Sequence, residues 1–90
     1  MYSIDLMDEA VALAERLGWR IRQEYLGEVG GGPCEIGGRK WIFLDIALSP
    51  PEQFEQLLDA LRRDPAIHTV KVPASLQQQL GVASVTRRAA

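Results

Sequence analysis

The first strong pattern in the chain is an apolar stripe near the N-terminus. Apolar residues recur there at helical spacing, at Leu6, Ala10, Leu13 and Leu17. Residues at this period form one face of an amphipathic helix, and Gly18 is placed to end it, because glycine is favoured just past the last turn. We therefore predict a helix over residues 4–17.

Two segments after this helix have the pattern of β-strands. Residues 19–26 alternate, with Trp19 and Ile21 on one side and charged residues on the other. Residues 41–48 (WIFLDIAL) are almost continuously apolar and are broken only by Asp45. Alternation is typical of a strand that is buried on one face, whereas a continuous apolar run is typical of a central strand that is covered on both faces.

The segment between these strands, LGEVGGGPCEIGGRKW, is rich in glycine and contains the one cysteine of the chain. Residues 37–38 (Gly-Gly) suit a two-residue hairpin loop, because both positions of such a loop favour positive φ. This register pairs Cys34 with Trp41. The glycines at 30–32 then belong to a looser loop, and a phosphate-binding loop is disfavoured because no helix follows them directly.

The clearest local signal is the string SPPEQFEQLLDALRRDP at residues 49–65. Ser49 and Glu52 have the spacing of a capping box, and Pro50 stands at the first helical position, where its missing N–H is tolerated. Apolar residues follow at helical spacing. The helix is predicted to end at Asp64, because a residue before proline avoids the helical region.

The rest of the chain completes a single small domain over residues 1–82. We predict a short strand over residues 67–73, a short helix over residues 74–81, and a frayed tail over residues 83–90, where no usable pattern is present. The predicted fold is α+β: a helix, a three-stranded antiparallel meander, a second helix on the same face, and a short C-terminal strand and helix.

The hairpin register sorts apolar side chains onto two faces of the sheet. Ile42, Leu44 and Ile46 form the cleaner aliphatic surface, to which we assign both amphipathic helices. The other face carries Cys34, Ile36, Trp41 and Phe43. The C-terminal segment offers too few apolar residues to cover it, and exposed apolar surface of this kind marks interfaces. We predict a small protein-interaction module that forms a homodimer through this face, since two-fold pairing is the commonest assembly of soluble chains.

Composition narrows the classes of function. Ninety residues fit one domain, and a net charge of −2 provides no basic excess for binding nucleic acid. A single cysteine forms no internal disulfide, which fits a reducing compartment. The N-terminus lacks the pattern of a signal peptide, and no apolar run reaches the length of a membrane span. We expect a cytoplasmic protein that binds neither nucleic acid nor membrane.

Three polar residues are the candidates for a ligand-binding or reactive groove: Cys34, Asp45 and His68. Asp45 interrupts an apolar run just before a helix, where its carboxylate could bond turn amides. Cys34 could act as a nucleophile only with a base nearby, and these residues lack the spacing of a zinc site. We predict no enzyme, cofactor or metal, while a thiol-dependent activity at Cys34 stays open. The alternative function is a small-molecule or metal-binding domain at this groove.

The segment WIFLDIALSPPEQFEQLLDAL resembles part of the ImmA/IrrE-type zinc metallopeptidases, in which a hairpin strand leads through a Ser-Pro-x-Glu cap into the active-site helix. The order helix–three strands–helix over residues 4–63 is also similar to the minimal zincin core. That family carries His-Glu-x-x-His where this chain has DALRR at residues 59–63, so the resemblance implies either a metal-free, non-catalytic relative or a convergent fold. The chain also resembles short bacterial proteins with a Gly-Gly-x-Cys strand and an LSP-E helix, which implies no known activity.

Overall fold

The computed structural model describes residues 2–27 and 30–82. Its elements, in chain order, are α1 (Ile4–Arg16), β1 (Trp19–Glu24), β2 (Gly32–Ile36), β3 (Arg39–Asp45), α2 (Pro50–Arg63), the 3₁₀ helix η2 (Pro65–Thr69) and α3 (Ala74–Leu80). The predicted α+β class is confirmed, with three α-helices and one three-stranded sheet in this part of the chain. The tail predicted at residues 83–90 lies outside the described residues.

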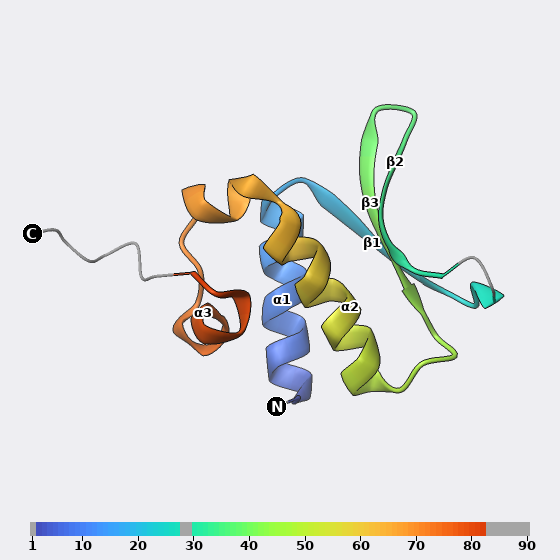
Figure 1. The fold of residues 1–90 in the computed structure, drawn as a ribbon, viewed down its shortest axis with the longest axis horizontal. Coiled ribbons are helices and arrows are strands. Elements are labelled where there is room, and N and C mark those ends of the chain that lie inside the picture. The colour runs from blue at the N-terminus through green and yellow to red at the C-terminus, as the bar shows by residue number, and fades with distance from the viewer. Residues whose placement is uncertain (1, 28–29, 83–90) are drawn as a thin grey trace, which may run out of the picture.

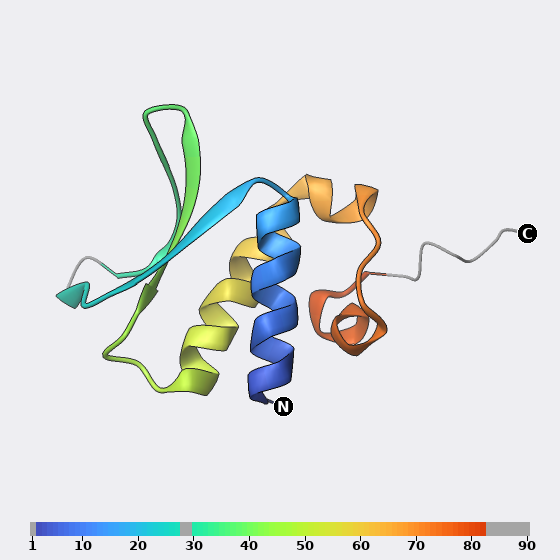
Figure 2. The same ribbon diagram turned by 180° about the vertical axis from the view of Figure 1, so that it is seen from behind.

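These elements stack in three layers. One face of the sheet packs against α1 and α2, and α3 packs on the opposite side of those two helices (Figure 1). The view from behind shows the same order, with the helices between the sheet and the C-terminal segment (Figure 2). The described C-terminal segment therefore covers the helices and does not lie on the second face of the sheet.

α1 confirms the helix predicted from the N-terminal stripe. The Ser3 hydroxyl caps its first turn by accepting a hydrogen bond of 3.1 Å from the backbone N–H of Leu6. Gly18 ends the helix with a φ of 94°, a positive value that glycine adopts without strain. The fully buried residues of α1 are Ala10, Leu13 and Ala14. Ala10 and Leu13 belong to the predicted stripe, which thus lies between the sheet and α3.

The sheet is mixed, so the predicted antiparallel meander is wrong. β3 lies in the centre, parallel to β1 and antiparallel to β2. In a meander, strands that follow one another in the chain are also neighbours in the sheet. Here β1 and β2 are joined by residues 25–31 and lie two strand spacings apart, about 10 Å, with β3 between them. The longer loop lets the most apolar strand take the central position, where the helices bury it.

The hairpin between β2 and β3 confirms the predicted register. Residues 37–38 have φ angles of 58° and 79°, as a two-residue loop of glycines requires. Cys34 pairs with Trp41, as expected. Because side chains alternate along a strand, Ile42 and Leu44 face the helices, and both are fully buried. The assignment of both helices to this face is therefore correct.

Ile46 does not lie with Ile42 and Leu44 on the buried face as predicted; it is 54% exposed. β3 ends one residue earlier, because the Asp45 carboxylate accepts a hydrogen bond of 2.9 Å from the backbone N–H of Ala47. This Asx-type turn redirects the chain toward α2. The apolar run of the sequence is thus longer than the strand that it forms.

α2 begins and ends where the sequence predicted. The Ser49 hydroxyl accepts from the backbone N–H of Glu52 at 3.4 Å, and the Glu52 carboxylate accepts from the backbone N–H of Ser49 at 2.9 Å. These reciprocal bonds complete the capping box and lower the pKa of Glu52, with the Ser49 backbone N–H as the main cause. Asp64 ends the helix immediately before Pro65.

The segment after α2 differs from the prediction. Residues 65–69 form η2, so the strand predicted over residues 67–73 is wrong. Asp64 starts this 3₁₀ helix by accepting a hydrogen bond of 3.0 Å from the backbone N–H of Ala66. The following helix, α3, is confirmed, and Gly81 ends it with a φ of 70°.

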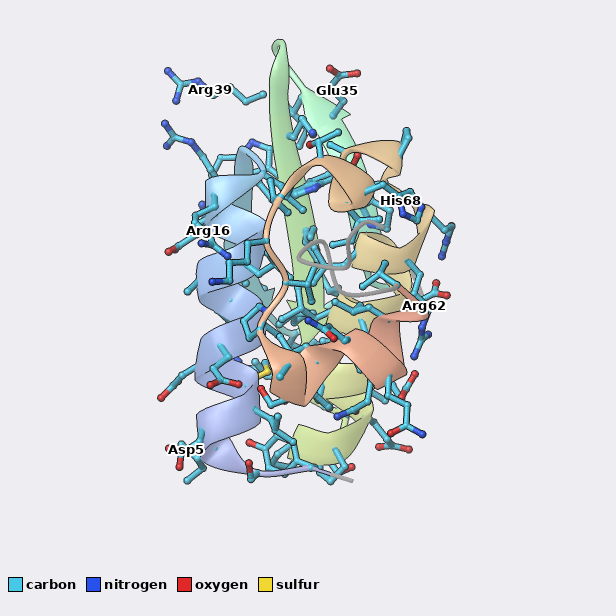
Figure 3. All side chains as sticks on the ribbon, turned by 90° about the vertical axis from the view of Figure 1, so that its left-hand side faces the viewer. Asp5, Arg16, Glu35, Arg39, Arg62 and His68 are labelled. Atoms are coloured by element: carbon cyan, nitrogen blue, oxygen red, sulfur yellow. The ribbon has the colours of Figure 1, made fainter. Side chains whose placement is uncertain are left out.

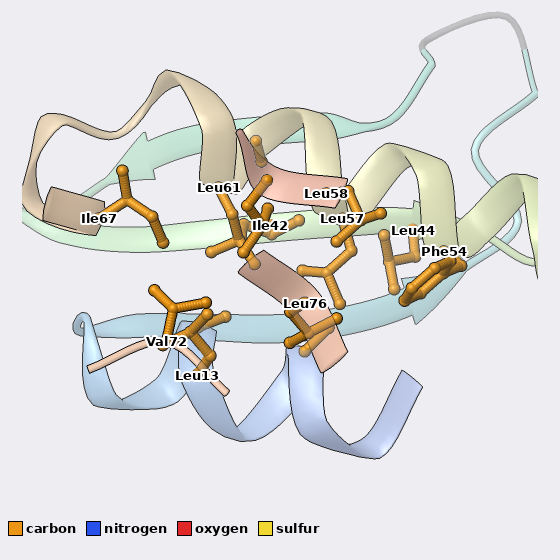
Figure 4. Packing of buried hydrophobic residues seen from close by; sticks show 14 residues of the cluster. Leu13, Ile42, Leu44, Phe54, Leu57, Leu58, Leu61, Ile67, Val72 and Leu76 are labelled. Atoms are coloured by element: carbon orange, nitrogen blue, oxygen red, sulfur yellow. The ribbon is translucent and has the colours of Figure 1, made fainter. Parts of the chain in front are cut away.

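The hydrophobic core fills both spaces between the layers. Buried leucines of α2 meet Leu13 of α1 and the inward residues of β3 in one cluster (Figure 4). The C-terminal segment adds Ile67, Val72, Leu76 and Leu80 to the same cluster. Because these four residues pack on the helices, the described C-terminal segment has no comparable apolar surface left for the sheet.

Candidate functional site

We define the outer face as the side of the sheet turned away from α1 and α2. Strand register and alternation place ten residues on it: Arg20, Arg22 and Glu24 of β1, Arg39, Trp41, Phe43 and the buried Asp45 of β3, and Gly32, Cys34 and Ile36 of β2. The four predicted interface residues therefore share one face. No described element covers it, so the prediction that β3 is covered on both faces is wrong for this part of the chain.

Two aromatic side chains run along the centre of this face, and we call Trp41 and Phe43 the aromatic ridge. Their ring centroids lie 6.1 Å apart at an interplanar angle of 64°, an edge-to-face contact. The guanidinium of Arg20 lies 5.8 Å from the centroid of the Trp41 ring, within the range of a cation–π contact. These contacts hold both rings in place although each side chain is only half-buried.

Positive charge flanks the aromatic ridge. We call Arg20, Arg22 and Arg39 the arginine group; all three are exposed on the outer face. The acidic residues in register on this face are the half-buried Glu24, whose carboxylate lies 2.6 Å from Arg22 Nε, and the buried Asp45. Figure 3 shows Arg39 directed to the opposite side of the hairpin from Glu35. The outer face is thus positive, although the whole chain carries a net charge of −2.

A hollow of about 420 Å³ adjoins the aromatic ridge on the β2 side. It is lined by Tyr25, Leu26, Gly30, Gly31, Gly32, Pro33, Cys34, Ile36 and Phe43. Most of these side chains are apolar, so the hollow suits an apolar group. Across the sheet the order is therefore hollow, aromatic ridge and arginines of β1.

Gly31 explains why the loop beside the hollow needs glycine. A Cβ at this position would lie 2.5 Å from the carbonyl oxygen of Phe43 and 2.6 Å from Nε2 of Gln56. The loop therefore packs directly on β3 and α2, closer than a side chain allows. The glycine stretch has a structural explanation: one close approach and, further on, one tight hairpin.

The structure does not bring Cys34, Asp45 and His68 together. Cys34 is exposed on the outer face, whereas His68 is exposed on η2, on the other side of the helices from the hairpin (Figure 1). His68 is therefore not a residue of a strand at the edge of the sheet, as the sequence suggested.

Asp45 has a structural role at the end of β3. Its side chain is buried, and the carboxylate accepts hydrogen bonds from the backbone N–H groups of Ala47 at 2.9 Å and Leu26 at 3.4 Å. The prediction that Asp45 bonds turn amides is confirmed. The carboxylate ties the loop after β1, which contributes Leu26 to the lining of the hollow, to the turn after β3.

Sequence reasoning missed one polar cluster, which we call the Asp64 cluster: Trp19, Lys40 and Asp64. The Trp19 indole N–H donates to Asp64 Oδ2 at 2.8 Å, and Lys40 Nζ lies 3.5 Å from the same oxygen. Lys40 Nζ also lies 4.5 Å from the centroid of the Trp19 ring. Trp19 and Lys40 are partners in the parallel register of β1 and β3, so only a correct sheet topology would have revealed the cluster.

The protonation of Asp64 follows from its surroundings. Burial raises the pKa of its carboxyl, but hydrogen bonds from Ala66 and Trp19 and the positive charge of Lys40 together hold the pKa below its usual value. The ionised carboxylate has donors on both oxygens. The Asp64 cluster therefore anchors the end of α2 to the sheet and has no unpaired group for chemistry.

Comparison with known protein families, curated proteins and solved structures finds no match to this chain. Within residues 2–27 and 30–82, no helix is long and apolar enough to cross a membrane. The same residues contain no group of three histidine, cysteine or acidic side chains that could hold a metal ion. The residues that the sequence resemblance compares with zinc ligands, Asp59 and Arg63, lie on α2 and form an ion pair with each other.

Proposed function

We propose that this protein is a small interaction module and that the outer face of the sheet is its binding surface. One observation supports the proposal above all: the aromatic ridge lies on a sheet face that no described element covers. Half-exposed tryptophan and phenylalanine side chains on a rigid sheet are costly to leave in water, and a bound partner removes that cost.

The composition of the face also supports binding to protein. Tryptophan and arginine are the residue types that contribute most often to the binding energy of protein interfaces. Here Arg20 packs on Trp41, and Phe43 contacts the indole edge-to-face. Side chains that are already ordered lose little conformational entropy on binding, which favours affinity.

Self-association is the form of this function that the sequence predicted, and the homodimer stays a prediction. The alternative of a small-molecule or metal-binding groove formed by Cys34, Asp45 and His68 has weaker support. These residues lie on different elements. Among four surface hollows formed by the described residues, including the one beside the aromatic ridge, none is lined by more than one of the three.

The proposed function can be tested by selecting a library of random peptides against the immobilised protein. We expect enriched peptides whose binding to the wild type is lost in Trp41→Asp and in Trp41→Ser, which removes the ring without adding charge. Circular dichroism establishes that each variant is folded. If all enriched peptides bind folded Trp41 variants as well as the wild type, the outer face is not the binding surface.

A further inference from the structure

We propose that the occupant of the outer face is a short acidic protein segment that carries a large apolar side chain. This inference rests on the proposed function and names the chemistry of the partner. It follows from the charge of the face, from the position of the hollow, and from the area that the sheet offers.

Charge is the first argument. The arginine group places three guanidinium groups around the aromatic ridge, and Glu24 balances one of them. Arginine binds carboxylates with paired N–H groups. The guanidinium of Arg20 lies 5.8 Å from the centroid of the Trp41 ring, and its side chain is exposed, so its N–H groups can meet a carboxylate. The face therefore favours aspartate and glutamate side chains in its partner.

The hollow adds the apolar requirement. It lies on the β2 side of Phe43, while Arg20 and Arg22 lie on β1 at the other side of the ridge. Adjacent strands are about 4.8 Å apart, so the hollow and these arginines are separated by roughly 10 Å. One short segment can reach both: an apolar side chain enters the hollow between Tyr25 and Phe43 while acidic side chains meet the guanidinium groups.

A second copy of the chain fits this face less well. The longest strand has seven residues, so three strands offer a surface of roughly 23 by 14 Å, or about 330 Å². A stable interface of standard size buries about 800 Å² on each partner. In a two-fold pairing the positive outer face of one copy would also lie against the same positive face of the other, and like charges disfavour association.

A single-stranded nucleic acid is the other polyanion that aromatic and basic side chains can bind. Stacking of bases needs open ring faces, whereas Arg20 lies over the Trp41 ring and Phe43 meets it edge-to-face. The net charge of −2 also opposes the approach of a polyanion to the rest of the surface. The observations thus favour an acidic protein segment.

The test is binding of short fluorescein-labelled peptides, measured by fluorescence anisotropy at low salt. The first peptide alternates aspartate and glutamate with leucine and phenylalanine. In the second peptide every acidic residue is replaced by its amide, and in the third every apolar residue is alanine. We expect the first to bind at least about tenfold more tightly than either control, and to weaken as salt is added.

Variants of the protein locate the effect. We expect Arg20→Gln with Arg22→Gln to weaken binding of the first peptide roughly threefold to tenfold, the range for two exposed charge pairs. The matched control is Arg63→Gln with Lys71→Gln, which removes the same charge from exposed sites on α2 and beyond η2. This control should bind as the wild type does. Equal binding of the acidic and amide peptides, or equal loss in both double variants, overturns the inference.

Two further outcomes would overturn it in favour of another occupant. Tighter binding of a labelled single-stranded oligonucleotide, with the same dependence on Arg20 and Trp41, would assign the face to nucleic acid. A dimer in sedimentation velocity at micromolar concentration that Trp41→Asp dissociates would assign it to a second copy and would leave the proposed function intact. If Trp41→Asp changes neither peptide binding nor association, the proposed function fails together with the inference.

Discussion

Replacement of Asp64 by alanine should destabilise the fold strongly, although Asp64 lies at a helix end and looks unremarkable in the sequence. Its carboxylate accepts hydrogen bonds from the Trp19 indole at 2.8 Å and from the backbone N–H of Ala66 at 3.0 Å. The variant would remove the acceptor for both donors and the charge partner of Lys40. These contacts connect α2, η2 and the two parallel strands, so no single element can restore them alone.

The magnitude follows from the number and type of these bonds. A hydrogen bond to a charged group contributes about 1.5–3 kcal/mol to stability. The more distant pair with Lys40, whose side chain is 37% exposed, adds a fraction of 1 kcal/mol because solvent screens it. A surface hollow lined by Trp19, Lys40 and Asp64, among others, lets water reach the site, which lowers the total. We therefore expect a loss of about 3 kcal/mol, out of roughly 4–14 kcal/mol for a domain of this length.

Urea denaturation followed by circular dichroism measures this loss. With a slope near 1.5 kcal/mol per molar, a loss of that size moves the midpoint by roughly 2 M. Asp64→Asn is the matched control, because its amide oxygen can still accept one hydrogen bond, and it should lose less. A midpoint of Asp64→Ala that equals the wild-type value would refute the role of the Asp64 cluster as an anchor.

The same variant gives a prediction on pH. The pKa of Asp64 is lowered in the folded protein, so its ionised form stabilises the fold at neutral pH. That contribution is complete above the unfolded pKa, near 4, and is lost as the pH falls through the lower pKa of the folded state. The difference in stability between wild type and Asp64→Ala should therefore be constant above about pH 5 and shrink below pH 4.

Three further predictions concern the fold and its chemistry. Ser49→Ala should cost on the order of 1 kcal/mol, because it removes the capping hydroxyl of α2; an unchanged denaturation midpoint would contradict this. Gly31→Ala should cost about 1–3 kcal/mol, since its methyl group would clash with the Phe43 carbonyl, whereas Gly30→Ala, with no atom in the way, should meet only backbone strain. Protein purified without chelator should contain no stoichiometric zinc. Where a zinc peptidase helix would need a glutamate base and a histidine ligand, α2 has Ala60 and Arg63. Elemental analysis that finds one zinc per chain would overturn this prediction.

Local signals predicted much of the fold. The stripe that contains Leu13, the capping box at Ser49 and the Gly-Gly loop at 37–38 each depend on a few neighbouring residues, and each is confirmed. The hairpin register also placed Trp41 and Phe43 on the uncovered side correctly. These features could be predicted because their physical causes, capping, periodicity and turn geometry, act within one element.

The failures concern contacts between distant segments. The parallel pairing of Trp19 with Lys40 depends on where β1 lies relative to the hairpin, and a loop of seven residues does not fix that choice. Residues 67–73 were predicted to form a strand, but Asp64 and Pro65 start a 3₁₀ helix that lets Ile67 and Val72 reach the helical layer. The burial of Ile67 and Val72 against the helices thus outweighed the local preference for a strand.

The candidate site was predicted in part for the same reason. Cys34, Ile36 and the aromatic ridge follow from the hairpin alone, so the sequence placed them on one face. The arginines of β1 join that face only through the parallel pairing, and the hollow depends on how the glycine loop packs. His68 was expected near Cys34 because η2 was mistaken for a strand.

The two tryptophans make one measurement especially direct. Trp41 lies on the outer face, whereas Trp19 is held by Asp64 on the inner side of the sheet. In a two-dimensional nuclear magnetic resonance spectrum of ¹⁵N-labelled protein, each indole N–H gives its own signal. On titration with the acidic, apolar peptide, we predict that the Trp41 signal shifts in a saturable way while the Trp19 signal stays in place. A shift of Trp19 without Trp41, or no shift of either, would contradict the assignment of the outer face as the binding surface.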